Sequence, residues 1–380
     1  MSYITHMENI VLYFLTNLST SERIQMDSTK EKNSNIEWMR TIAIFLVVLI
    51  HFCNYYTSKT TPSFTFDYSV ALLYNVFARI SVPLFFMISG ALSFRKDFDF
   101  SKNNRKILHM IIVLVVWNII YWLWDYFFLD RSMTTNIVSY IFIPVKNHLW
   151  YMYAYIALLI SNPLIAVLAK YMKPVYENYF IAAWLLLCGG IRTLDFVLDY
   201  AGINTQLEYA VPIIQSTYYL GYYLCGHILY KRLHDKAQPG SARATKLLSY
   251  RPAVYITVAV ILLMTCFAVT SLVSVDVEHD TEKSMFGYSN ILIMLPSVCI
   301  FIAMLKMDLK SNRLIETVGR FSFGVYLSHV LFYNIIYTSI DVRAMDSITA
   351  LPLLSLVTLA VSILFTCLTS HMPLLKKLLY

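Results

Sequence analysis

Two ionisable side chains stand inside long apolar segments of this 380-residue chain. His51 lies in the apolar segment 38–57, and Arg79 lies in the apolar segment 71–94. Histidine exchanges protons near neutral pH, and arginine binds negative charge through its guanidinium group. An ionisable group at bilayer depth costs about 2.5–3.5 kcal/mol on insertion scales, so it indicates a functional site by default. A histidine packed in the core and an arginine in a structural ion pair are the alternative interpretations.

Arg40 precedes His51 by eleven residues. At about 100° per residue this separation is roughly 1100°, or about three turns plus 20°, so both side chains leave one helix face about 16 Å apart. We expect His51 to lie about two-thirds of the way across the membrane, near the depth of Arg79. The spacing therefore predicts that His51 and Arg79 share a site, with Arg40 as a separate cation at the inner end of the same helix.

Other polar and aromatic residues occupy comparable places in further apolar segments. They are His148, Trp150, Tyr326, His329, Ser89, Asp125 and Arg320. A belt of aromatic residues at the membrane surface is the alternative explanation for His148 and Trp150. Polar contacts between packed helices explain Tyr326 and His329 equally well, and a close helix approach explains Ser89.

Sequence motifs for several enzyme classes are absent. The chain contains no HExxH, P-loop, GxGxxG or GxSxG pattern, so zinc protease, nucleotide triphosphatase, dinucleotide-binding and serine hydrolase functions are unsupported. The six cysteines occur singly within apolar runs, which indicates small core residues rather than disulfides or metal ligands. We predict no metal site.

Composition restricts the class of protein. Hydrophobic residues make up 58% of the chain and charged residues 14%, whereas soluble domains carry roughly 25% charged residues. A soluble protein of this size would expose large apolar patches. A soluble globular protein, a disordered chain and a nucleic-acid-binding protein are therefore excluded.

Ten apolar segments are each long enough to cross a bilayer as a helix. They lie near 38–57, 71–94, 107–128, 148–168, 178–196, 210–230, 253–274, 286–305, 318–339 and 351–371. The segment 137–145 is too short to span, and we expect it to lie against the outer surface. The predicted fold is an all-α polytopic membrane protein of about ten transmembrane helices.

Lysine and arginine predict the orientation of these helices. The segments on one side of the predicted membrane hold 21 of them and the segments on the other side hold six. Because positive residues stay in the cytoplasm, we expect both termini to be cytoplasmic and the acidic segment 274–286 to face outward.

The chain is expected to have one membrane domain and two short ends. Residues 36–371 form the ten-helix domain, residues 1–35 a cytoplasmic leader and residues 372–380 a cytoplasmic tail. Residues 1–25 lack the features of a signal peptide, and Met26 is a plausible start, so this part is expected to be dispensable.

Four motifs, in chain order, resemble membrane acyltransferase family 3. They are Arg40 with His51, RISVPLFFMISG at 79–90, HLWY at 148–151 and FGVYLSH at 323–329. The family usually has Phe where this chain has Tyr151. The resemblance covers about 36–371, and within the family it is nearest to the O-acetyltransferases of enterobacterial common antigen and O-antigens.

The resemblance implies an enzyme of the bacterial inner membrane that uses cytoplasmic acetyl-CoA as co-substrate, with no bound cofactor. The implied acceptor is a hydroxyl of a lipid-linked or surface saccharide. His51 would act as a base or as an acyl carrier, and Arg79 would stabilise the oxyanion. Arg40 and Arg320 would hold the donor phosphates, and Asp125 would orient His51.

Two other functions fit the same residues. An exporter of a glycan or lipid would use the intramembrane arginine and histidine to bind its substrate. A structural membrane subunit would need neither residue for chemistry, which the deep charges argue against.

Overall fold

The computed structural model describes residues 33–58, 65–94, 97–128, 143–203, 205, 213–234, 246–273, 287–342 and 345–379. Within these residues all regular structure is helical and no strand occurs. The helices belong to one compact unit, Ser34–Tyr380. The predicted leader, with Met26 and the dispensable residues 1–25, lies almost entirely outside the described residues, as does most of the predicted surface segment 137–145.

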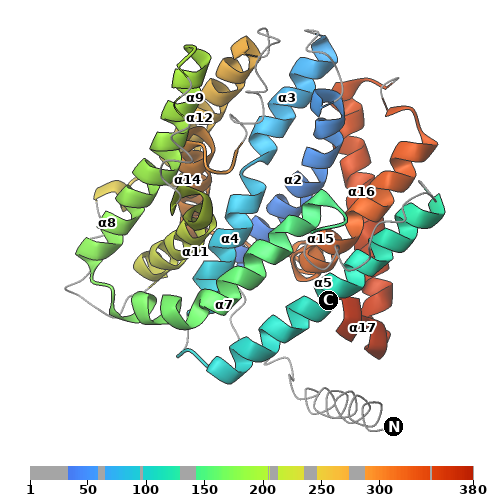
Figure 1. Cartoon of the computed structure of the whole chain (residues 1–380), viewed down its shortest axis with the longest axis horizontal. Coiled ribbons are helices and arrows are strands. Elements are labelled where there is room, and N and C mark those ends of the chain that lie inside the picture. Colours follow the sequence, from blue (N-terminus) through green and yellow to red (C-terminus); the bar gives the residue numbers. More distant parts are fainter. Residues whose placement is uncertain are drawn as a thin grey trace. The chain divides into compact units, whose positions relative to one another are not determined.

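The described residues of each of the ten apolar segments lie mainly on a helix or a run of consecutive helices (Figure 1). The longer helices are α2 (Ser34–Ser58), α3 (Phe66–Ala78), α4 (Ser81–Ser93), α5 (Phe100–Phe128), α7 (Trp150–Tyr171), α8 (Pro174–Trp184), α9 (Ile191–Tyr200), α11 (Ile213–His234), α12 (Pro252–Val273), α14 (Ile291–Lys306), α15 (Arg313–Ser339) and α16 (Ser347–Ser370). Four short elements complete the set: η2 (Asn147–Leu149), η3 (Leu185–Gly190), η4 (Lys246–Leu248) and α17 (Pro373–Leu379).

Seven helical spans among the described residues are long and apolar enough to cross a membrane. The apolar helix α14 is shorter, and the long helices α11 and α15 do not reach the same apolarity. Many large apolar side chains on the spans are exposed, for example Leu164 of α7 and Leu364 of α16. Apolar side chains facing outward suit a lipid environment, so the prediction of an all-α multi-pass membrane protein is confirmed. The number ten and the cytoplasmic termini stay predictions.

The span predicted as one helix at 71–94 consists of α3 and α4, which meet at Arg79 and Ile80. Pro83 explains the break, because proline has no N–H and its ring clashes with the carbonyl of the residue four positions earlier, which is Arg79. Helix α3 closes instead with the Arg79 N–H, which donates to the carbonyls of Asn75 at 3.1 Å and Val76 at 3.3 Å. Arg79 thus lies at an interruption within a transmembrane span.

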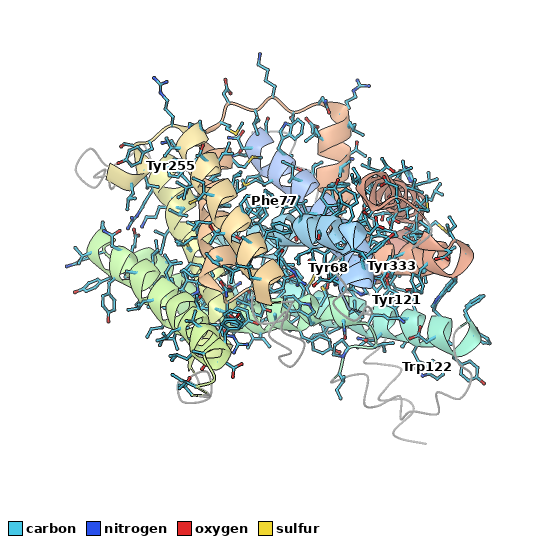
Figure 2. The ribbon with its side chains drawn as sticks, turned by 90° about the horizontal axis from the view of Figure 1, so that it is seen from above. Tyr68, Phe77, Tyr121, Trp122, Tyr255 and Tyr333 are labelled. Atoms are coloured by element: carbon cyan, nitrogen blue, oxygen red, sulfur yellow. The ribbon has the colours of Figure 1, made fainter. Side chains whose placement is uncertain are left out.

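Helix α2 has neighbours on several sides. Helices α3, α4, α14, α15 and α16 all pack against it, and Figure 1 shows it beside α3 and α16. Figure 2 shows the side chains of Tyr68, Phe77 and Tyr333 within the bundle, with Trp122 toward its edge. A residue on the inner faces of α2, α4 or α15 is therefore shielded from lipid.

Two glycines let α4 and α11 approach each other most closely. A Cβ atom added at Gly90 would overlap the carbonyl of Tyr223, and one added at Gly226 would overlap the carbonyl of Met87. Backbones that approach this closely are typical of helix pairs with small residues at the interface in membrane proteins. Ser89 and its neighbours are therefore held firmly against α11.

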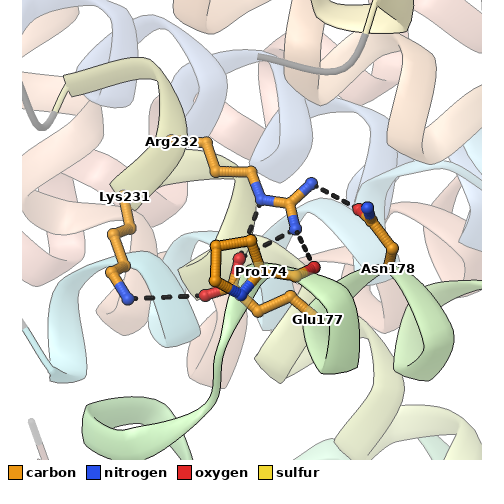
Figure 3. Close-up of polar contacts among 5 residues, drawn as sticks. All are labelled: Pro174, Glu177, Asn178, Lys231 and Arg232. Carbon is orange, nitrogen blue, oxygen red and sulfur yellow. Dashed lines mark hydrogen bonds and ion pairs between the residues drawn. The ribbon is translucent and has the colours of Figure 1, made fainter. Parts of the chain in front are cut away.

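A buried carboxylate joins α8 to the end of α11 (Figure 3). Glu177 lies 2.8 Å from the Arg232 guanidinium and 3.4 Å from Lys231 Nζ. Arg232 also donates to the side-chain oxygen of Asn178 at 2.8 Å and to the carbonyl of Pro174 at 3.3 Å. We name this group the Glu177 ion pair. It connects two helices through charge-assisted hydrogen bonds.

Candidate functional site

Three histidines from separate parts of the chain meet inside the bundle. His51 comes from α2, His148 from η2 and His329 from α15. Their ring centres are 4.9 Å apart for His51 and His329, 5.1 Å for His148 and His329, and 6.1 Å for His51 and His148. We name this group the histidine cluster. The sequence analysis proposed each of these residues, but only the fold brings all three together.

One ring nitrogen of His329 is hydrogen-bonded to backbone carbonyls, and the other has no hydrogen-bond partner among the described residues. Its Nδ1 lies 3.0 Å from the carbonyl of Val325 and 2.7 Å from the carbonyl of Tyr326. Since carbonyls only accept hydrogen bonds, Nδ1 carries the proton, and in the neutral ring Nε2 keeps a lone pair. Nε2 is buried and has no hydrogen-bond partner among the described residues. An unpaired buried polar atom costs about 1–3 kcal/mol, which is typical of a site that receives a proton or a substrate.

His148 is fixed by aromatic rings and by its own backbone. The Tyr326 hydroxyl donates to the His148 carbonyl at 2.6 Å, and the Tyr121 hydroxyl donates to the Leu327 carbonyl at 2.7 Å. The rings of Tyr121 and Tyr326 lie 5.1 Å and 5.7 Å from the His148 ring. Its ring nitrogens are buried without a hydrogen bond of ordinary length and angle in the described part of the chain.

His51 is the member of the cluster with accessible surface. His148 is 6% exposed and His329 is fully buried, whereas His51 is only partly buried. The ring of Tyr333 on α15 lies 6.0 Å from the His51 ring. His51 is therefore the least buried residue of the three.

Arg79 is connected to α2, the helix that carries His51, through two asparagines. Arg79 Nε donates to Asn75 Oδ1 at 3.1 Å, and Asn75 Nδ2 donates to Asn54 Oδ1 at 2.9 Å. Asn54 follows His51 by three residues on α2, and Arg79 is near enough to act electrostatically on His51. The sequence analysis missed Asn75, although it lies one helical turn before Arg79, which is the spacing of neighbours on one helix face.

Aromatic rings line the other side of Arg79. The guanidinium carbon lies 5.7 Å from the centre of the Tyr288 ring, within the range of a cation–π contact. Trp150 lies 5.8 Å from Tyr288 and stacks on Tyr219 at 5.1 Å. Trp150, a predicted site residue, thus belongs to an aromatic wall beside Arg79, whereas Tyr219 and Tyr288 gave no sequence signal because the chain is rich in tyrosine.

Ser89 lies beside tyrosines instead of histidines. Its side chain faces the Tyr151 hydroxyl, and its carbonyl accepts from Ser93 Oγ at 2.8 Å. The Tyr151 ring is 5.4 Å from that of Tyr326, which borders the histidine cluster. Two tyrosines, Tyr151 and Tyr326, therefore lie between Ser89 and the histidine cluster.

Arg40 and Arg320 lie near the neighbouring N-terminal ends of α2 and α15. Arg40 forms an ion pair with Glu37 at 2.9 Å, and Glu37 packs against Gly319, the neighbour of the exposed Arg320. The Thr41 hydroxyl donates to the Ile315 carbonyl at 3.3 Å and joins the same two helix ends. Glu37, which the sequence analysis did not consider, offsets part of the positive charge of this region.

Asp125 does not lie on His51, so its predicted role as the orienting partner is wrong. Its Oδ1 is 2.7 Å from Lys146 Nζ, two residues before His148. The physical reason is the register of α5, which puts Asp125 one turn beyond Tyr121 and opposite the segment that leads into η2. Spacing along the sequence did not indicate that Lys146 folds back onto α5.

The described residues contain no group of three or more histidine, cysteine, aspartate or glutamate side chains with the geometry of a metal site. The histidine cluster and Arg79 hold groups suited to proton transfer and to stabilisation of a negative charge. Both are what acyl transfer to a hydroxyl requires.

Comparison with known proteins agrees with this chemistry. A family model described as an acyltransferase domain matches residues 33–367, which include the histidine cluster, Arg79, Arg40 and Arg320. No curated protein and no solved structure matches the chain significantly.

Proposed function

The chain belongs to the acyltransferase family whose model it matches, and we propose that it transfers an acetyl group from cytoplasmic acetyl-CoA to a hydroxyl of a saccharide. The observation that carries this proposal is the histidine cluster, in which the His51 ring centre lies 4.9 Å from that of His329 and His51 lies near Arg79, while the buried Nε2 of His329 has no hydrogen-bond partner among the described residues. The acceptor is a lipid-linked or cell-surface glycan, and the setting is the bacterial inner membrane. No cofactor and no nucleic acid take part.

The reaction replaces the acyl–sulfur bond of the donor by an acyl–oxygen bond to the acceptor. The acceptor oxygen bonds to the thioester carbonyl carbon, the carbon–sulfur bond breaks with its electron pair on sulfur, and the hydroxyl proton ends on the thiolate. His51 either takes this proton as a base or first carries the acetyl group on a ring nitrogen. The guanidinium of Arg79 stabilises the negative carbonyl oxygen of the tetrahedral intermediate.

The donor end is separate from the reaction centre. Arg40 and Arg320 lie at the shared end of α2 and α15, where they hold the phosphates of coenzyme A. Arg40 and His51 occupy one face of α2 about 16 Å apart along the axis. That distance lets one extended molecule contact both residues, while neither residue reaches the other's atoms.

Acetyl transfer by the purified protein tests this function. The full chain in nanodiscs is given labelled acetyl-CoA and lipid-linked saccharides extracted from bacterial membranes. We expect label on the saccharide with the wild type and none with His51→Ala. Saccharide that binds the protein without gaining label would instead favour an exporter, and transfer by His51→Ala would remove the histidine cluster from the mechanism.

A further inference from the structure

The segment that carries His148 is fastened to α5 by two polar contacts. Lys146 Nζ lies 2.7 Å from Asp125 Oδ1, and the Val145 N–H donates to Asn118 Oδ1 at 3.0 Å. Residues 143–146 have no helical structure of their own, and η2 follows directly. These contacts therefore hold the non-helical backbone that leads to His148.

The α5 residues that make these contacts share one face. Asn118, Tyr121 and Asp125 are three and four positions apart, which is the spacing of neighbours along a helix face, and all three are buried. The Tyr121 ring packs against the His148 ring at 5.1 Å. One face of α5 thus contacts Val145, Lys146 and His148.

Holding a segment by a buried ion pair costs free energy, because both charges lose their hydration. The side chain of Asp125 is 5% exposed and that of Lys146 is 20% exposed. Removing two charges from water offsets much of their attraction, and apolar residues of similar size often stabilise a fold equally well. What an ion pair adds is a defined geometry, and here that geometry is set two residues from a member of the histidine cluster.

We propose that the Asp125–Lys146 ion pair is a positioning device that fixes His148 within the histidine cluster. The proposal rests on the proposed function, because it assigns these residues a task in the same site. Neither residue touches substrate. Both act through the position of His148, whose other support is the hydrogen bond from the Tyr326 hydroxyl to its carbonyl.

Variants of the pair test this role when they are compared with a matched control. Asp125→Asn and Lys146→Met break the pair, whereas Asp125→Glu keeps it. The control is Glu177→Gln, which removes the charge of a buried carboxylate in the ion pair between α8 and α11. Measurements on the full chain in nanodiscs are the kcat and KM for acetyl transfer, direct acetyl-CoA binding and the midpoint of thermal unfolding.

We expect Asp125→Asn and Lys146→Met to lower kcat roughly ten- to hundredfold, because small displacements of a reacting group have effects of that size. Acetyl-CoA binding should stay within about twofold of the wild type, since neither substitution changes a residue proposed to bind the donor. Asp125→Glu keeps a lengthened pair, so it should lower kcat measurably but less than either pair-breaking variant. Glu177→Gln should lower the unfolding midpoint with kcat unchanged.

Two results would overturn the proposal. One is wild-type kcat in both pair-breaking variants. The other is a loss of activity in both variants that disappears when the rate is expressed per folded protein, which would reduce the pair to the purely structural role expected of the control. If a pair-breaking variant does not fold, Asp125→Glu decides, because a lengthened but intact pair should lower kcat measurably without lowering the unfolding midpoint. The proposed function fails separately, when His51→Ala transfers acetyl groups normally.

Discussion

At the scale of single residues, the histidines of the cluster differ in burial and in hydrogen bonding. His329 is fully buried and bonded through Nδ1 to backbone carbonyls, so its ring is held in one orientation. His51 is partly accessible and faces it at 4.9 Å. Sequence analysis predicted a shared site for His51 and Arg79 from their depth in the membrane. It did not predict that His329 and His148 complete that site, because their approach depends on long-range packing of α15 and α5.

Because Arg40 and His51 lie far apart, substituting each of them should change the kinetics of acetyl transfer in a different way. Arg40→Ala should weaken acetyl-CoA binding about tenfold or more, as expected for the loss of a charge-assisted hydrogen bond, and excess donor should restore the rate. His51→Ala should abolish turnover at every donor concentration while donor binding survives. Acetyl-CoA titration of both purified variants measures this difference. Loss of donor binding in His51→Ala with normal turnover in Arg40→Ala would reverse the assignment.

The Glu37 ion pair adds a third variant to this comparison. Glu37 neutralises part of the charge on Arg40, so Glu37→Gln should leave donor binding unchanged or tighten it. The reason is that an anionic side chain beside Arg40 competes with phosphate for the same donors. Weaker acetyl-CoA binding in Glu37→Gln would show that Glu37 orients Arg40 instead of competing for it.

At the scale of the helices, the break between α3 and α4 is what places Arg79. Pro83 was visible in the sequence, and a proline inside an apolar run indicates an interruption about one turn earlier. The segment was nevertheless predicted as one helix, because its apolar residues continue without a gap. The π-helical turn η3, by contrast, had no such signal. It depends on contact of Gly189 with Ile291 and Met294 of α14, which only the packed structure reveals.

Restoring a continuous helix through Arg79 should lower the acetyl transfer rate without lowering the stability of the protein. Pro83→Ala returns an N–H that can donate to the Arg79 carbonyl, which favours one helix through positions 79 and 80. We expect an unfolding midpoint equal to or above that of the wild type and an acetyl transfer rate lowered at least tenfold, since Arg79 would leave its position at the break. Thermal unfolding and kcat on the same preparation measure both. An unchanged kcat would show that the break does not position Arg79.

At the scale of the whole molecule, the C-terminal helix α17 closes onto α5. Residues 372–380 were expected to be a tail, yet residues 373–379 form a helix whose Leu379 is buried. Trp117 Nε1 donates to the Leu379 carbonyl at 3.0 Å. The Trp117 ring lies 5.7 Å from Tyr121, which in turn contacts His148. Amphipathic pattern alone did not predict this contact, because it depends on the return of the chain after α16.

Removal of α17 should therefore affect both stability and the site. Ending the chain after Met372 leaves the buried indole N–H of Trp117 without its acceptor, which costs about 1–3 kcal/mol. We expect a lower unfolding midpoint and a lower kcat, because Tyr121 loses support on the side away from His148. Trp117→Phe is the matched control, since it removes the donor and keeps α17. A truncated protein with the stability and rate of the wild type would show that α17 does not support this side of α5.

Orientation in the membrane decides which side supplies the donor. Arg40 and Arg320 must face the cytoplasm if they bind acetyl-CoA, and the charge distribution of 21 basic residues against six predicts that they do. A cysteine introduced by Asp280→Cys should then react with a membrane-impermeant thiol reagent in intact spheroplasts. One introduced by Gly240→Cys should react only after the membrane is opened. Unsubstituted protein is the control, because its own six cysteines lie within apolar segments. The reverse pattern would turn the donor end outward, away from cytoplasmic acetyl-CoA, and would contradict the proposed direction of transfer even if the histidine cluster proved essential.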